Sequence, residues 1–127
     1  MLSEPMKISD IPSTALDSDY IFAFCSFLDD FYSSDSDIKS LLLKDEPPKN
    51  ILDNQQYCKL AAAAHKLSND NKLPVPEWVM KDEYKMAYPV YALDTKKETV
   101  KNALRETSFF EYKIRNLFLG EKALSRT

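Results

Sequence analysis

The sequence predicts an all-α protein, a compact single-domain bundle of four to five helices crossed by one proline-rich extended segment. Apolar residues recur at intervals of three and four, which is the periodicity of amphipathic helices. Only one of the 127 residues is glycine, and acidic or hydroxyl side chains stand where helices should begin. A chain of this length can bury one core without disulfides.

Residues 1–17 are polar and contain two prolines, so we expect a flexible lead-in before a helical domain over residues 18–127. From Ser18 onward one broad apolar face predicts the first helix. The Ser- and Asp-rich break at 33–37 suits the cap of a second helix, which must end before Pro47. The apolar face of the first helix comprises Tyr20, Ile21, Phe24, Phe27, Leu28 and Phe31.

Asp53 and Gln56 have capping-box spacing and predict the start of a central helix. Its run of four alanines, residues 61–64, has high helix propensity and lets another helix approach closely. The polar run 68–72 ends it. Next, Leu73–Trp78 has prolines at alternate positions, which favours an extended segment that lays Trp78 against the body.

Residues 79–94 are expected to be irregular, with an aromatic lining. Thr95 and Glu98 form another capping-box pattern, which predicts a helix with Val100, Ala103 and Leu104 facing inward. Its basic side chains, Lys97, Lys101 and Arg105, should face outward. A further helical turn restarts at residues 107–108, and the apolar run that follows continues to Gly120, a natural stop.

The composition excludes most patterns of catalytic chemistry, because the chain has one histidine, one glycine and two cysteines. A phosphate-binding loop needs several glycines, a zinc site needs clustered Cys and His, and a Ser–His–acid triad must use the one histidine. We therefore expect a protein that is not an enzyme and that holds no cofactor and no metal.

Several residue groups nevertheless have two interpretations. Cys58 and His65 lie seven positions apart on one side of the central helix. They could be two metal ligands or structural side chains. The acids at 29, 30, 35 and 37 could hold a cation or cap helix ends. Glu77, Asp82 and Glu83 could act as acid–base pairs.

An aromatic group offers a small-molecule site as an alternative. Trp78 with Tyr84, Tyr88 and Tyr91 could stack on a base, which would suit a small-molecule enzyme, or could seal the bundle under a long loop. Cys25 and Cys58 stand in apolar contexts and are expected to be buried thiols. With no apolar leader and no long apolar run, the sequence predicts a soluble, cytoplasmic protein without membrane contact.

Charge is distributed unevenly along the chain. Residues 1–53 hold 11 acids and 4 bases, whereas residues 54–127 hold 9 acids and 13 bases, so the halves carry −7 and +4. A basic C-terminal face would suit an acidic protein partner, and its candidate residues are Arg105, Lys113, Arg115 and Asn116. The alternatives are a solvated helix face, or a DNA-binding regulator that contacts phosphates through Lys97, Lys101, Arg105, Lys113 and Arg115.

Short motifs in a fixed order complete the sequence evidence. They are Phe27–Tyr32, Asp45–Pro48, Leu73–Trp78, Arg105–Ser108, Arg115–Phe118 and Leu124–Arg126. This succession resembles a bacterial family of small antitoxin-like proteins, found alone or fused behind a helix-turn-helix domain, that neighbour nucleotidyltransferase-type toxins. The resemblance implies the antitoxin-like or regulatory member of a toxin–antitoxin pair, with the toxin as its protein partner. This chain has no separate helix-turn-helix domain, and Glu111–Lys113 stands where the family often has more arginines.

Overall fold

The computed structural model describes residues 5–92 and 97–120, which are mostly helical, as predicted. These residues form six α-helices, where four to five were predicted, and one small sheet. The helices are α1 (Ile11–Asp17), α2 (Tyr20–Ser33), α3 (Ser36–Lys44), α4 (Asn54–Asp70), α5 (Glu98–Thr107) and α6 (Phe110–Lys113). Short 3-10 helices and strands complete them: η1 (Ile8–Asp10), η2 (Glu77–Met80), η3 (Asp82–Tyr84), β1 (Val90–Tyr91) and β2 (Leu117–Phe118).

Aspartate caps fix the starts of three helices. Asp19 Oδ1 accepts from the backbone N–H of Phe22 at 2.7 Å, and Asp35 caps α3 in the same way. At α4 the predicted capping box is confirmed, because Asp53 accepts from the Gln56 N–H while the Gln56 side chain accepts from the Asp53 N–H. These local bonds satisfy N–H groups that the first helical turn leaves without a partner.

Residues 5–17, the described part of the segment predicted to be a flexible lead-in, pack on the bundle. Ile8 and Ile11 are both 0% exposed. The Met6 N–H donates to Asp30 Oδ2 at 2.7 Å, which ties the segment to α2. The few apolar residues of this short stretch, among them Ile8, Ile11 and Ala15, are buried or partly buried because other parts of the chain pack on them.

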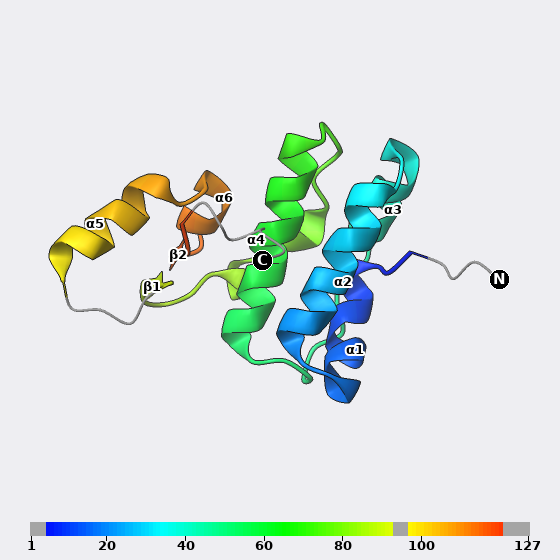
Figure 1. The fold of residues 1–127 in the computed structure, drawn as a ribbon, viewed down its shortest axis with the longest axis horizontal. Coiled ribbons are helices and arrows are strands. Elements are labelled where there is room, and N and C mark those ends of the chain that lie inside the picture. Colours follow the sequence, from blue (N-terminus) through cyan, green and yellow to red (C-terminus); the bar gives the residue numbers. More distant parts are fainter. Residues whose placement is uncertain (1–4, 93–96, 121–127) are drawn as a thin grey trace.

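Helix α4 is central and is buried on two sides. Ala61, Ala62, Ala63 and Ala64 are all 0% exposed, because small side chains let neighbouring elements approach α4 from both directions. On one side α4 joins the main core with α1, α2 and α3. On the other it packs against Tyr112 and Leu117 in a second, smaller cluster. Figure 1 shows α4 between these two parts, with α5 at the opposite end of the molecule from α1 and α3.

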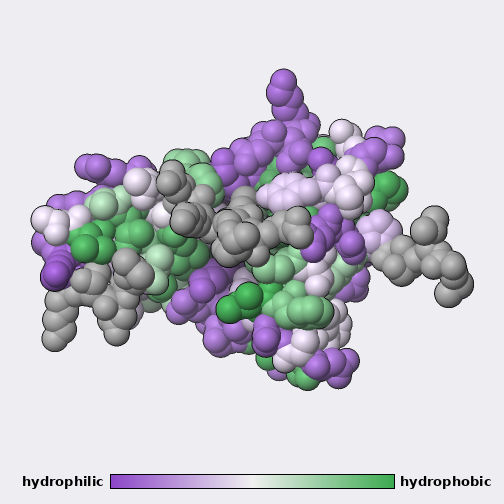
Figure 2. Space-filling view, in the orientation of Figure 1, coloured by the Kyte–Doolittle hydropathy of each residue, from purple (hydrophilic) through white to green (hydrophobic). Residues whose placement is uncertain are grey.

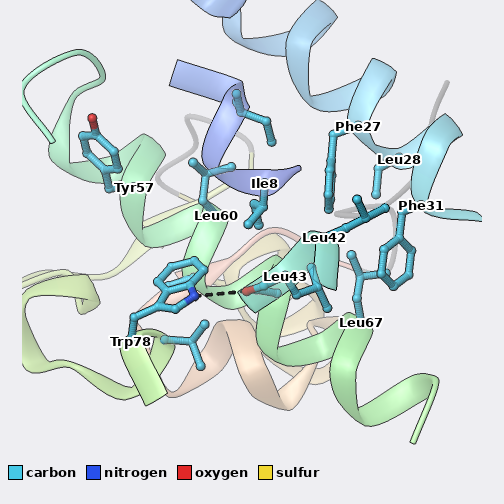
Figure 3. Packing of buried hydrophobic residues seen from close by; sticks show 14 of the residues in the cluster. Ile8, Phe27, Leu28, Phe31, Leu42, Leu43, Tyr57, Leu60, Leu67 and Trp78 are labelled. Atoms are coloured by element: carbon cyan, nitrogen blue, oxygen red, sulfur yellow. Dashed lines mark hydrogen bonds between the residues drawn. The ribbon is translucent and has the colours of Figure 1, made fainter. Parts of the chain in front are cut away.

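Trp78 lies at the edge of the main core, as predicted, and is 6% exposed. Its Nε1–H donates to the backbone oxygen of Leu43 at 3.1 Å, which joins the proline-rich segment to the end of α3 (Figure 3). Tyr84 meets the Trp78 ring edge-on at a centroid distance of 5.6 Å. The indole ring is therefore packed against apolar neighbours, and its N–H has a hydrogen-bond acceptor.

The C-terminal part differs from the sequence prediction. The apolar run after α6 turns into strand β2, which pairs in parallel with β1 in the register Val90–Leu117 and Tyr91–Phe118. Asn116, in the turn after α6, has a φ of 62°, a left-handed conformation that directs the chain away from the helix and into β2. Gly120 has a φ of 77° but follows strand β2, so it does not end a helix as predicted. The predicted cap Thr95 lies outside the described residues, and α5 begins at Glu98.

Within residues 5–92 and 97–120, no helix combines the length and the hydrophobicity that crossing a bilayer would require.

Candidate functional site

The four residues predicted to bind a partner do not form one exposed surface. Arg115 is 1% exposed, so the expectation of an exposed arginine at this position is wrong. Asn116 is half-buried, and its Nδ2 donates to the Met86 backbone oxygen at 2.7 Å, which holds the loop before β1. Arg105 and Lys113 are likewise partly exposed, so they are the two cationic candidates that remain on the surface.

Arg115 instead holds three elements together. Its Nη1 donates to the Glu111 backbone oxygen at 2.6 Å, and its Nη2 donates to the Val79 backbone oxygen at 2.7 Å. Nη1 also lies 3.2 Å from Nδ1 of His65 on α4. Burial lowers the pKa of the guanidinium, although Cys58 and Glu111 act in the opposite direction. The buried Nε has no hydrogen-bond acceptor among the described residues.

Two basic side chains of α5 that were predicted to face outward, Lys101 and Arg105, lie partly against the small sheet. The Lys101 ammonium lies 5.4 Å and the Arg105 guanidinium 5.5 Å from the centre of the Tyr91 ring. Arg105 Nη2 also donates to the Tyr91 hydroxyl at 2.7 Å, while Ala103, predicted to face inward, is exposed. An aromatic face attracts cations, and the long stems of Lys and Arg cover apolar surface. These two cations thus stabilise α5 on the small sheet, which leaves them less available for phosphates.

The candidate metal ligands have other neighbours. His65 contacts Arg115, and Cys58 Sγ lies 4.0 Å from the Glu83 backbone oxygen. Burial raises the pKa of the Cys58 thiol to about 11, so it stays protonated at neutral pH. In the described part of the chain, no group of three or more His, Cys, Asp or Glu residues could hold a metal ion. Both Cys25 and Cys58 are thiols, although only Cys58 is fully buried.

The acids near the end of α2 have structural partners: Asp35 caps α3, and Asp30 accepts from Met6. The aromatic residues proposed as one stacking pocket are separated. Trp78 and Tyr84 are buried against each other, Tyr91 stacks on Phe118 at a centroid distance of 5.3 Å, and Tyr88 is 80% exposed. Trp78 and Tyr84 therefore seal the bundle.

A surface that the sequence prediction missed lies where α1 turns into α2. Leu16, Ile21 and Phe22 are 69%, 72% and 58% exposed. Ile21 was expected to face the core. We call these three residues, with the exposed acids Asp17 and Asp19 between them, the α1–α2 corner. Figure 2, in the same orientation as Figure 1, shows hydrophobic surface over the lower end of α2.

The sequence held a signal for this corner. Helix α2 carries large apolar residues at consecutive positions, Tyr20, Ile21 and Phe22, and consecutive residues of a helix point about 100° apart. They cannot all face one core. The structure buries the side that carries Ala23, Phe27 and Phe31, so Ile21 and Phe22 face outward.

The corner lies in a stretch with charge of one sign only. Between Lys7 and Lys39 the chain has no lysine or arginine but seven aspartates, at positions 10, 17, 19, 29, 30, 35 and 37. Among the described residues, no ion pair includes Asp17 or Asp19. The corner thus combines protruding apolar side chains with negative charge.

No family model, curated protein or solved structure matches this chain. The binding chemistry of the chain is therefore inferred from its own side chains.

A groove of about 910 Å³ also lies between the end of α3 and the proline-rich segment. Leu41 and Val75 line it, and they are 52% and 36% exposed. Its charged lining mixes both signs, because Lys44 and Lys81 stand beside Asp45, Glu46 and Glu77. Lys81 already pairs with Glu46 at 2.8 Å. This mixture selects no particular ligand charge, in contrast to the α1–α2 corner.

Proposed function

We propose that this chain is a protein-interaction module, the antitoxin-like or regulatory member of a bacterial toxin–antitoxin pair. The observation that carries the proposal is the exposure of Leu16, Ile21 and Phe22 at the α1–α2 corner. Three large apolar side chains exposed within seven positions of the chain are typical of a protein-binding surface.

The resemblance in motif order supports the antitoxin-like part of the proposal. Several of the residues that carry this resemblance are buried: Phe27, Phe31, Trp78, Arg115 and Leu117 are at most 6% exposed. Buried motif residues of this kind maintain a fold. Surface residues would then select the partner, and the α1–α2 corner brings three exposed large apolar residues within seven positions of the chain.

The test is co-expression with the product of the adjacent gene, followed by purification and measurement of stoichiometry and cell growth. A stoichiometric complex that relieves toxicity is expected. The double substitution Ile21→Ser with Phe22→Ser should weaken the complex at least tenfold, because exposed apolar anchors are typical hot spots. Its melting temperature should stay close to that of the wild type, since both side chains are mostly exposed.

Leu41→Ser is the matched control, because Leu41 is 52% exposed but lies on α3, outside the corner. It should leave the complex intact. Arg105→Ala and Lys113→Ala test the partly exposed basic residues in the same assay. Failure to form any complex with the adjacent product would contradict the proposed function. Loss of the complex only in the two basic variants would move the interface to the C-terminal part.

A further inference from the structure

We infer that the α1–α2 corner binds a lysine- and arginine-rich amphipathic helix of the partner protein, an inference that rests on the proposed function and specifies its partner's chemistry. The corner is formed by two consecutive helices, α1 and α2, joined by a short turn at Ser18 and Asp19. Leu16 comes from the last turn of α1, whereas Ile21 and Phe22 come from the first turn of α2.

The shape of the corner suits a third helix. Side chains of two packed helices form ridges and grooves, and an added helix can insert its own side chains between them. Leu16 is exposed on α1, and Ile21 and Phe22 are exposed on α2, so a helix laid across the turn between them would contact apolar side chains of both helices. An amphipathic helix laid on such a surface uses apolar positions three and four residues apart as its anchors.

The charge of the corner determines the polar face of that helix. Asp17 and Asp19 lie between Leu16 and Ile21 in the chain, and both are exposed. Lysine or arginine beside the apolar anchors of the partner would meet opposite charge, whereas glutamate or aspartate would meet repulsion. Asp19 Oδ1 accepts from the Phe22 N–H as the cap of α2, and its side chain is nevertheless exposed.

The same charge disfavours the other candidate occupants. A second copy related by a two-fold axis would place the same acidic corner against itself. Anionic lipid and nucleic-acid phosphates would also be repelled, since both are negatively charged. A basic amphipathic helix is the occupant that would bind favourably to both the apolar and the acidic residues of the corner.

Two synthetic peptides test the inference on the full-length protein. Both carry the same leucine pattern over about four helical turns, but one has lysine and the other glutamate at every polar position. Fluorescence anisotropy with labelled peptide should show saturable binding of the lysine peptide and none of the glutamate peptide. Raising the salt from 0.05 M to 0.5 M should weaken the lysine peptide at least tenfold, because salt screens surface charge.

Variants separate a specific site from general attraction to an acidic protein. Ile21→Ser with Phe22→Ser should weaken the lysine peptide at least tenfold, and Leu41→Ser should not change it. Asp17→Asn with Asp19→Asn should weaken it several-fold, while asparagine preserves the cap of α2. Equal affinity for the wild type and the Ile21–Phe22 variant, or equal binding of both peptides, overturns the inference.

Two further outcomes would replace the basic helix by another occupant. Self-association in light scattering that Phe22→Ser abolishes would assign the corner to a second copy. Binding to vesicles of anionic lipid that the same variant abolishes would assign it to a membrane. The complex with the adjacent gene product could also need Phe22 and yet keep its affinity when salt is raised or when Asp17→Asn and Asp19→Asn are combined. That result would overturn the charge argument and leave the proposed function in place.

Discussion

Arg115 and His65 meet in the protein interior, fifty positions apart in sequence, with Arg115 Nη1 and His65 Nδ1 separated by 3.2 Å. A guanidinium carries donors only, so Nδ1 of His65 must accept. The imidazole is then neutral, with its proton on Nε2. This contact joins the end of α6 to α4, and the bond from Arg115 to the Val79 backbone oxygen adds η2 to the same junction.

Removing the Arg115 side chain should destabilise the protein. Arg115→Ala leaves the buried carbonyls of Glu111 and Val79 without their donors and opens a cavity, which should cost about 3 kcal/mol of unfolding free energy. Urea denaturation followed by circular dichroism measures this. Lys113→Ala, two positions away and partly exposed, is the control and should change stability by less than about 0.5 kcal/mol. Equal losses for both variants would contradict the structural role of Arg115.

Stability should fall at mildly acidic pH because of His65. Burial and the nearby Arg115 charge hold the pKa of His65 below 6.5 in the folded protein, although Glu111 acts in the opposite direction. As pH falls below 6.5, the unfolded chain therefore takes up a proton before the folded one does. The stabilisation by neutral His65 is complete above this pH and decreases below it.

His65→Gln provides the comparison, because its side-chain oxygen can accept from Arg115 and does not titrate. Urea midpoints measured between pH 7.5 and pH 5 should decrease more steeply for the wild type than for this variant. Glu111 does not interfere in this range. Burial raises its pKa, but the bond from Asn69 and the charge of Lys66 outweigh burial and keep the pKa below 4.5. Parallel curves for the two proteins would show that His65 does not titrate as inferred.

Trp78 should contribute both packing and one buried hydrogen bond. Trp78→Phe keeps most of the apolar contact but leaves the Leu43 backbone oxygen without its donor, and we expect a loss of about 1–2 kcal/mol. Trp78→Ala should cost about 3 kcal/mol or more, as large-to-small core substitutions do. Tryptophan emission of the folded wild type should be blue-shifted from that of the unfolded chain. A water-like emission maximum in the folded state would contradict the burial of the indole.

Cys58 should be unreactive in the native protein. Its thiol is 0% exposed, and burial raises its pKa to about 11, so the thiolate that reacts with disulfide reagents is scarce. In a Cys25→Ser background, labelling of Cys58 should be slow in buffer and fast in concentrated urea. If labelling is as fast in buffer as in urea, Cys58 is accessible in solution.

Local sequence was sufficient for most of the helices. The capping box at Asp53 and Gln56 marks the start of α4, because its bonds are made within one helical turn. The end of α3 before Pro47 also follows from residues close in sequence. The sequence by itself thus determines a mostly helical chain, its caps and its proline-rich segment.

Tertiary structure decided which side of each element is covered. Periodicity shows which residues share a helix face, but a face is buried only where a distant segment packs on it. Arg115 is buried because Val79 and His65, 36 and 50 positions away, supply its acceptors. Lys101 turns inward because Tyr91 offers an aromatic ring, whereas Ile21 stays exposed because the core contacts the opposite side of α2. The α1–α2 corner therefore became visible only once the packing of α2 was known.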